Sequence, residues 1–574
     1  MPRLRALFGI ILVTSLAAAS PACDGADETS SGSSTASTTT TTSTTVEMPP
    51  PLGPLPAGEA VESDRFATSG HCNQCHLAAE SPVMHDAAGE DISPAFLWRS
   101  SMMAFAARDP YYLAVFSEEL AARPGIAEEV ERTCTRCHAP AGSVEHEQTG
   151  GHLTFAALTA EATPEANLGR DGVTCSLCHQ IKGVGLGSPG SFGGSFEVGF
   201  SREMFGPHQQ PNPEPMEFFL GYTPTYAEHV ATSELCATCH TVVVPVLDAD
   251  GAPAGGEFLE QAPYLEWLNS DYRGDAPCQA CHMPQVDADG SVISSPISKF
   301  PEGLSPREPF GKHVFVGGNA YMLGMLADAD NLVWAGSDVS AGELAAAAAR
   351  SEEHLRDGVD VSIASAAPDG DALRVVVEVK NAAGHKYPTG YPSRRAWIHF
   401  RAEDAAGKVV LESGAFDASG AIVDAAGKRL DVPGVVAPHL DAVSSSEEVQ
   451  IYEAIAGDLS GAPTHRALGA ASFLKDNRLL PAGWSSGHGW IDWIAPVGVE
   501  GDASFGAAGD QVTYRIAGGG AVRRVVVELL YQSVPPATLD MVAAVPTPAA
   551  VRFSEMARER PPTPVVVAST SLDL

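Results

Sequence analysis

The stretch CTRCH at residues 134–138 is one of five segments of the same form in this chain of 574 residues. The others are CNQCH (72–76), CSLCH (175–179), CATCH (236–240) and CQACH (278–282). Each segment has two cysteines separated by two residues, and a histidine directly after the second cysteine. Ten of the eleven cysteines fall in these segments, so one repeated motif organises the first half of the chain.

This spacing is the one that covalent attachment of haem c requires. Each thiol adds to one of the two vinyl groups of a haem, and the adjacent imidazole then lies beneath the iron as its proximal ligand. Zinc sites also use paired cysteines, but they need no histidine directly after every pair. Redox disulfides leave the five histidines unexplained as well. The motifs therefore predict five covalently bound haem c groups.

The predicted attachment sites and proximal ligands follow from the motifs. Thioether bonds are expected at Cys72, Cys75, Cys134, Cys137, Cys175, Cys178, Cys236, Cys239, Cys278 and Cys281. Proximal iron ligands are expected at His76, His138, His179, His240 and His282. Long and short intervals between the motifs alternate, which indicates haems arranged in pairs. Haems this crowded are expected to lie close enough for electrons to pass between them.

A haem that only transfers electrons normally has both axial positions filled, whereas a catalytic haem leaves one open. Four histidines outside the motifs are candidates for the second position. His229 precedes the fourth motif in AEHVATSELCATCH, and His208 lies in the Gly/Pro loop MFGPHQQPNP. His313 lies in GKHVFVGGN, after the last motif. His385 lies in NAAGHKYPTGYPSRRAW (381–397), on a loop expected between two strands. For each, the alternative is an ordinary surface or core histidine.

A fifth distal ligand is expected in ISPAFLWRSSMMAFAARDP (92–110). Ser93 as N-cap, Pro94 at the first helical position and an Asp-Pro stop at 109–110 predict a helix of about four turns. Met102 and Met103 are the candidates, because a thioether beside a haem can be an axial ligand that raises the reduction potential. The alternative is that these methionines only fill the core.

These motifs, together with LWRSSMMAFAARDPYY, HVFVGGNAYML, GHKYPTGYPSRRAW and FLKDNRLLP, resemble a group of exported multihaem c-type cytochromes over roughly residues 67–570. More distantly, the haem region is similar to tetrahaem cytochromes and hydroxylamine oxidoreductase-type proteins. In those distant relatives a histidine often stands where Met103 follows Trp98 and Ser101 here. The resemblance implies a haem-wrapping α domain and electron transfer, but it identifies no substrate.

The N-terminus and the charge indicate where the protein works. MPRLRALFGIILVTSLAAASPAC is typical of an export signal over residues 1–22, with Cys23 as a lipidated first residue. The alternative is ordinary cleavage that leaves Cys23 a free thiol. Residues 23–66, rich in Ser, Thr and Pro, are expected to be a tether. We expect a periplasmic or cell-surface lipoprotein on a membrane surface, and the net charge of −36 argues against nucleic acid as a partner.

The sequence predicts a multidomain chain, with a mainly α/irregular pentahaem domain at 67–357 and an all-β domain at 358–574. The Ala-rich segment 340–357 predicts a linking helix. About seven strand-like runs after it predict an antiparallel sandwich of the immunoglobulin-like type, followed by a helix near 548–560 and a Pro-rich end. Arg394 and Arg395, beside the His385 loop, either pair with haem propionates or are solvated.

Three functions remain open at this stage. The first is electron transfer along five haems to or from another redox protein. The second is a respiratory oxidoreductase in which one haem has an open position and acts on a small inorganic nitrogen or sulfur substrate. The third, compatible with the first, is docking of another redox protein by the β-domain. Electron transfer is preferred over catalysis, and no catalytic residue is predicted.

Overall fold

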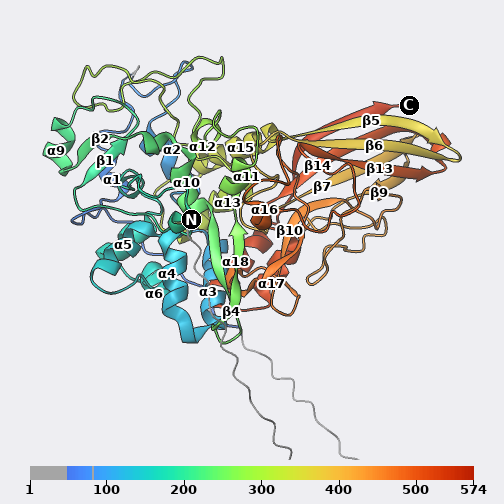
Figure 1. The fold of residues 1–574 in the computed structure, drawn as a ribbon, viewed down its shortest axis with the longest axis horizontal. Helices are drawn as coiled ribbons and strands as arrows, with labels where there is room; N and C mark the ends of the chain where they lie inside the picture. Colours follow the sequence, from blue (N-terminus) through green and yellow to red (C-terminus); the bar gives the residue numbers. More distant parts are fainter. Residues whose placement is uncertain (1–47, 81–82) are drawn as a thin grey trace, which may run out of the picture. The chain divides into compact units, whose positions relative to one another are not determined.

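The first cysteine of each motif lies in a helix. These helices are Ser69–Cys72 (α1), Ala127–His138 (α4), Cys175–Cys178 (α8), Ser233–His240 (α10) and Cys278–His282 (α12). The computed structural model describes residues 48–80 and 83–574; the predicted leader 1–22 and Cys23 lie outside the described residues. Figure 1 shows the motif helices in one half of the described chain and most strands in the other.

The other helices of the motif half are also short, and several have proline in the first turn, where its missing N–H costs no hydrogen bond. They are α2 (Pro94–Arg99), α3 (Pro110–Ala122), α5 (Pro140–Gln148), α6 (Phe155–Ala160), α7 (Pro164–Arg170), α9 (Glu214–Leu220), α11 (Pro263–Leu268), α13 (Ala320–Leu326) and α14 (Ala329–Trp334). Two small strand pairs lie among them: the parallel pair β1 (Glu203–Gly206) and β2 (Thr223–Tyr226), and the antiparallel pair β3 (Val242–Leu247) and β4 (Pro253–Gln261).

The predicted four-turn helix after Ser93 is wrong in length. α2 ends at Arg99, and turns lead from there to α3, which begins at Pro110. Pro110 has no N–H to donate to the carbonyl of Ala106, so a continuous helix would leave that carbonyl unpaired. In the structure Ala106 O lies 2.9 Å from His138 Nδ1, and Met103 O accepts the Val173 N–H at 3.0 Å. The turns therefore make backbone carbonyls available to motif 134–138 and to the segment just before motif 175–179.

The predicted linking helix is confirmed as α15 (Ala341–Asp357). It begins with a capping box, in which the Ser340 side chain accepts the Glu343 N–H and the Glu343 carboxylate accepts the Ser340 N–H. Its buried stripe includes Leu344, Ala347 and Leu355. The chain runs from this helix almost directly into the first strand of the β half.

The β half contains two sheets, and all seven predicted strands are confirmed. The strands are β5 (Val359–Asp369), β6 (Ala372–Asn381), β7 (Arg395–Asp404), β8 (Val409–Ser413), β9 (Ala442–Val443), β10 (Ile451–Gly457), β11 (Pro463–Thr464), β12 (Ser472–Asp476), β13 (Gly509–Ala517), β14 (Val522–Gln532) and β15 (Val565–Asp573). One sheet has the order β11-β10-β7-β14-β15, with β12 and β8 attached, and the other has the order β5-β6-β13-β9. The pair β9–β13 is parallel, so the second sheet is mixed.

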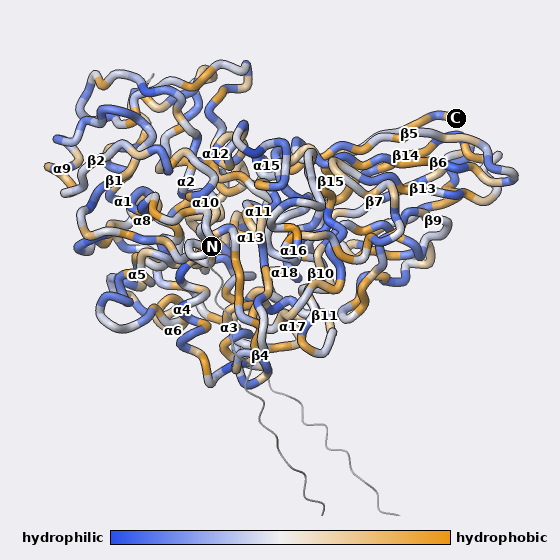
Figure 2. The backbone as a smooth tube through the Cα atoms, viewed as in Figure 1, coloured by the Kyte–Doolittle hydropathy of each residue, from blue (hydrophilic) through white to orange (hydrophobic). Residues whose placement is uncertain are grey.

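The two sheets enclose one apolar core. Val375, Val377 and Val379 alternate along β6 and are fully buried, and Figure 2 shows the matching alternation of apolar and polar residues along these strands. Phe400 of β7 stacks on Tyr514 of β13, with ring centroids 3.9 Å apart. Because these rings belong to different sheets, the contact joins the two faces of a sandwich. The immunoglobulin-like strand arrangement stays a prediction.

The last part of the chain returns to the motif half. Two helices follow β14, namely α17 (Pro536–Ala543) and α18 (Pro548–Glu559), and a short helix, α16 (Ile491–Ile494), precedes β13. Phe553 of α18 packs on Tyr111 of α3. Leu52 donates its N–H to Pro548 O at 2.7 Å, so the packed chain begins inside the predicted tether of residues 23–66. Residues 48–574 form one compact unit across the boundary predicted at 357. No helix within the described ranges has the length and apolarity needed to cross a membrane.

Candidate haem centres

One large cavity collects the chemistry-bearing residues of all five motifs. It has a volume of about 1540 Å³, and its lining includes all ten motif cysteines and all five motif histidines. A pocket for one drug-sized ligand usually measures roughly 300–1,000 Å³. The ten thiols are free, with no disulfide among the described residues. The cavity therefore presents five pairs of free thiols to whatever fills it, as attachment of several large flat groups requires.

The motif histidines are oriented by backbone carbonyls. The Nδ1 atoms of four of them lie 2.7–2.9 Å from a carbonyl oxygen, in the pairs His76–Ile297, His138–Ala106, His179–Phe205 and His282–Val316. Because a carbonyl only accepts, each Nδ1 must carry the proton, which leaves Nε2 with a free lone pair. Metal-binding histidines normally donate their other ring N–H in this way, so these four rings fit an iron site.

Burial keeps these imidazoles neutral. It lowers the pKa of His138 to about 4 and that of His313 to about 4. Burial, together with the nearby rings of His354 and His385, lowers the pKa of His282 to about 3. A histidine binds metal through the neutral ring, so at pH 7 no proton has to be displaced from these side chains.

Two motif histidines have a second imidazole at a spacing that suits one shared metal ion. The ring centroids of His179 and His313 are 6.3 Å apart, and those of His282 and His385 are 6.2 Å apart. Half of either separation is about 3.1 Å, which is the distance expected from a ring centre to a metal bound by its nitrogen at about 2.0–2.1 Å. The second rings are oriented like the first, with Nδ1 of His313 2.9 Å from Gly311 O and that of His385 2.9 Å from Lys386 O.

The remaining predicted ligands differ in their placement. His208, Met102 and Met103 line the cavity, but no ring contact or hydrogen bond ties any of their side chains to a particular motif. His229 lies outside the cavity lining. Its Nε2 is 2.8 Å from Ile181 O, and its ring packs against Gly183. Its other ring nitrogen, Nδ1, faces Gly183 and not the cavity, so no observation places His229 beside a motif histidine.

Sequence reasoning missed His354. This side chain of α15 lines the cavity, and its ring centroid lies 5.0 Å from that of His282. It falls in the Ala-rich helix, where the strong helix-forming pattern hid its position next to a motif. A signal was present, because His354 follows the buried stripe position Ser351 by three residues and so lies close to the buried face of the helix.

The two arginines beside the His385 loop have different surroundings. Arg394 lines the cavity and donates to Thr389 O and Asn319 Oδ1. Arg395 is buried in the β half, where it pairs with Asp431 at 2.7 Å. For Arg395 both expectations were wrong, since it is neither solvated nor at the cavity. Of these two arginines, Arg394 is the one placed to meet an acidic group inside the cavity.

Cysteines of different motifs lie near one another. In three pairs the neighbouring thiol raises the pKa of the first-named one, namely Cys175 beside Cys72, Cys239 beside Cys137 and Cys236 beside Cys278. Leu177 of the third motif and Leu235 beside the fourth pack in one apolar cluster, which Cys178 and Cys239 also contact. Motif 236–240 therefore lies next to three others, at 134–138, 175–179 and 278–282, and motif 72–76 lies next to 175–179. The spatial order of the motifs differs from their order in the sequence.

Gly194 holds the second and fourth motifs together, and replacing it tests the cavity. Arg136 Nε donates to Gly194 O at 2.8 Å, and the Gly194 N–H donates to Thr238 O at 2.6 Å. A Cβ on Gly194 would come within 3.0 Å of Cys137 Sγ. We expect Gly194→Ala to lower the fraction of protein with a full set of haems, measured by intact mass. Gly193→Ala is the matched control, because Gly193 also has a positive φ but open space at its Cβ.

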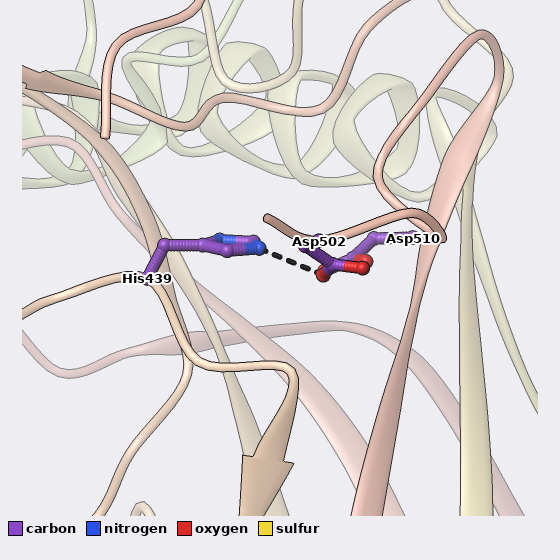
Figure 3. Close-up of side chains that lie close together, drawn as sticks. All are labelled: His439, Asp502 and Asp510. Carbon is purple, nitrogen blue, oxygen red and sulfur yellow. Dashed lines mark hydrogen bonds and ion pairs between the residues drawn. The ribbon is translucent and has the colours of Figure 1, made fainter. Parts of the chain in front are cut away.

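A second cluster of ligand-type side chains lies in the β half. His439, Asp502 and Asp510 bring their ligand atoms within 4.8 Å of one another, and Figure 3 shows His439 directed at Asp502. Nδ1 of His439 accepts hydrogen bonds from the side-chain amides of Gln450 (2.8 Å) and Asn477 (3.0 Å), so the proton is on Nε2, which donates to Asp502 at 3.0 Å. These contacts satisfy the histidine within the protein, and the cluster joins two loops to the sheet.

No family model and no curated protein matches the chain. Among solved structures, a crystal structure of a penta-heme cytochrome c552 from Thermochromatium tepidum is similar, with 18% sequence identity and a TM-score of 0.49. The similarity covers 90% of this chain and 100% of that one. At these values the likeness carries no part of the assignment, which depends on the thiols and imidazoles described above.

Proposed function

We propose that this chain is a multihaem c-type cytochrome that carries electrons along five covalently bound haems. The observation that carries the proposal is that all ten motif thiols and all five motif imidazoles line one cavity. When bound, haem supplies an iron that accepts and donates single electrons. The chain's own residues would attach it through the motif thiols and orient it through the carbonyl-bound histidines.

The assignment of axial ligands is part of this proposal. His179 and His313 would hold one iron, and His282 and His385 another, because both pairs have the centroid spacing and the Nδ1 hydrogen bonds that a shared metal ion needs. His208, Met102 and Met103 remain candidates for the other irons. Arg394 is placed to balance the charge of haem propionates inside the cavity.

The thiol contacts support a branched route for electrons. Motif 72–76 contacts motif 175–179, which shares an apolar cluster with motif 236–240. From 236–240 the contacts continue to 134–138 and to 278–282. We infer that motif 236–240 is the junction of the chain of haems and that motif 72–76 is one of its ends.

The place of the protein in the cell is likewise a proposal. The leader-like residues 1–22 and Cys23 support export and lipid anchoring, so that the cytochrome exchanges electrons with other redox proteins at a membrane surface in the periplasm or on the cell surface. Intact mass and fatty-acid analysis of the native protein test this point. A mature chain that begins at another residue without acyl groups would contradict it.

Haem content is the decisive test of the main proposal. Protein matured in a host with the c-type cytochrome assembly system is expected to gain the mass of five haems, which survive denaturation because they are covalently attached. Replacing both Cys134 and Cys137 by alanine should remove one of them. A wild-type chain without added tetrapyrrole mass would refute the proposal.

The second candidate function is a respiratory oxidoreductase with one open haem, for a small inorganic nitrogen or sulfur substrate. One observation favours it. Within the described ranges, His76, His138 and His240 have no second imidazole in ring contact, and His138 stacks instead on Tyr112 at 3.8 Å. An EPR spectrum of the oxidised wild type separates the two functions: entirely low-spin iron supports electron transfer alone, and a high-spin haem that binds added cyanide supports the enzyme.

A further inference from the structure

Three phenylalanines form an exposed aromatic patch on the motif half. Phe218 is 82% exposed, Phe219 is 56% exposed and Phe300 is 46% exposed. Their rings touch in series, with centroids 5.0 Å apart for Phe218–Phe219 and 5.4 Å apart for Phe219–Phe300. Contiguous exposed apolar patches mark interaction sites, and aromatic residues are enriched in protein interfaces relative to the rest of the surface.

The patch does not serve the packing of its own helix. α9 (Glu214–Leu220) has no buried residue, so Phe218 and Phe219 belong to a helix that packs only loosely against the rest of the chain. Figure 1 places α9 at the outer edge of the motif half, on the side away from the β strands β5–β15. Leaving the 82% exposed ring of Phe218 in water adds nothing to stability, and this ring is not part of the cavity lining, which points to a use outside the fold.

The patch lies next to the first haem motif. Phe300 follows Ile297, whose carbonyl orients His76, and Lys299, whose N–H donates to Cys75 O at 3.0 Å. Phe219 and Phe300 also line the cavity, so the same rings face both the solvent and the haem space. The patch therefore lies beside motif 72–76, one end of the proposed electron route.

The surroundings of the patch are acidic. Four exposed carboxylates lie in the two segments that form it, namely Glu214, Glu217, Glu302 and Glu308. None of them forms an ion pair within the described part of the chain. Arg202 pairs with Glu62 at 2.6 Å. Within the two segments Lys299 and Arg307 are the basic side chains, so the four carboxylates outnumber them and the local charge is negative. The patch is thus apolar at its centre and negatively charged at its rim.

We propose that Phe218, Phe219 and Phe300 form the docking site of a basic redox protein whose cofactor edge is surrounded by lysines. The aromatic centre supplies contact area, and the acidic rim attracts and orients such a partner. The overall charge of −36 acts in the same direction and disfavours both a second copy of this chain and an anionic membrane as the occupant. This inference rests on the proposed electron-transfer function and assigns it an exchange surface at the first motif.

The test uses the full haem-loaded chain and a basic mitochondrial-type monohaem cytochrome c as the probe. Phe218→Gln/Phe219→Gln is expected to weaken the probe's binding by about tenfold or more, as loss of central aromatic anchors does. Glu214→Lys/Glu217→Lys should slow electron transfer at low salt and flatten its salt dependence. Val333→Gln, at a 73% exposed position on α14, is the matched control and should leave both quantities unchanged.

Two results would overturn the docking site. One is unchanged binding in the double phenylalanine variant; the other is self-association or binding to anionic vesicles that this variant abolishes, which would assign the patch to a second copy or to a membrane. Failure of the proposed function looks different. A chain that lacks five haems, or whose haems dithionite does not reduce, fails before any docking is measured.

Discussion

The haem-loaded His385→Ala variant is expected to show one of the five proposed haem irons converted from low spin to high spin. The reason is the 6.2 Å centroid spacing between His385 and His282, which fits two imidazoles on one iron. Alanine removes the second ring nitrogen, so His282 would be the one protein ligand left for that iron. EPR of the oxidised protein measures the change, because high-spin and low-spin ferric haem give separate signals. The same result is expected for His313→Ala at the third motif.

Two further variants make this experiment decisive. His354 is 5.0 Å from His282, so it is a possible replacement ligand, and His385→Ala/His354→Ala removes it as well. His229→Ala is the negative control, since that ring lies outside the cavity and is expected to leave the spectrum unchanged. A wild-type spectrum in both the single and the double His385 variants would exclude His385 as an axial ligand.

Asp476→Asn is expected to lower the free energy of unfolding by about 3–5 kcal/mol, the usual cost of breaking one side of a buried charge pair. Asp476 is 2% exposed and pairs with Lys386 at 2.6 Å and with Arg478 at 2.7 Å. Lys386 is fully buried and would lose this counter-charge. Urea unfolding of the haem-loaded protein measures the loss. Asp369→Asn is the control, because its pair with Arg515 is exposed and is expected to contribute under about 1 kcal/mol.

The same pair predicts a pH dependence. Burial by itself would raise the pKa of Asp476, but the charges of Arg478 and Lys386 outweigh burial and hold this pKa well below its usual range. An unfolded aspartate has a pKa of about 3.9. The stabilisation is therefore fully present above that pH and is lost as the pH falls towards the folded pKa. The stability gap between wild type and Asp476→Asn should shrink in acid; a gap that grows there would contradict this account.

The Lys386–Asp476 pair also helps to hold the proposed haem ligand His385 in place. Lys386 directly follows His385, and its N–H donates to the buried carboxylate of Glu266 at 3.1 Å. Thr389 donates to the same carboxylate at 2.6 Å. Because Glu266 lies on α11 of the motif half, these bonds hold the loop between β6 and β7 against the motif half. We expect Asp476→Asn to broaden the low-spin signal assigned to the His282 haem before any unfolding is seen.

Local patterns predicted much of the secondary structure. The β-branched runs predicted seven strands, and the Ala-rich segment predicted α15, because these signals depend on neighbours along the chain. β15 was missed although Val565–Val567 carries the same signal, since the prolines before it indicated an irregular end. α2 was predicted too long, because the sequence did not reveal that Val173 and His138 take carbonyls from the segment after it.

The sequence by itself determined where haem can be attached, because two thiols and an imidazole within five residues meet one haem whatever the rest of the chain does. Only the tertiary structure decided which second histidine faces which motif, since His385 reaches His282 through a loop of the β half and His229 is turned to Ile181 O. It also decided that Phe218, Phe219 and Phe300 form one surface. Axial pairing and surface shape depend on contacts between distant segments, and such contacts leave no periodic signal in the sequence.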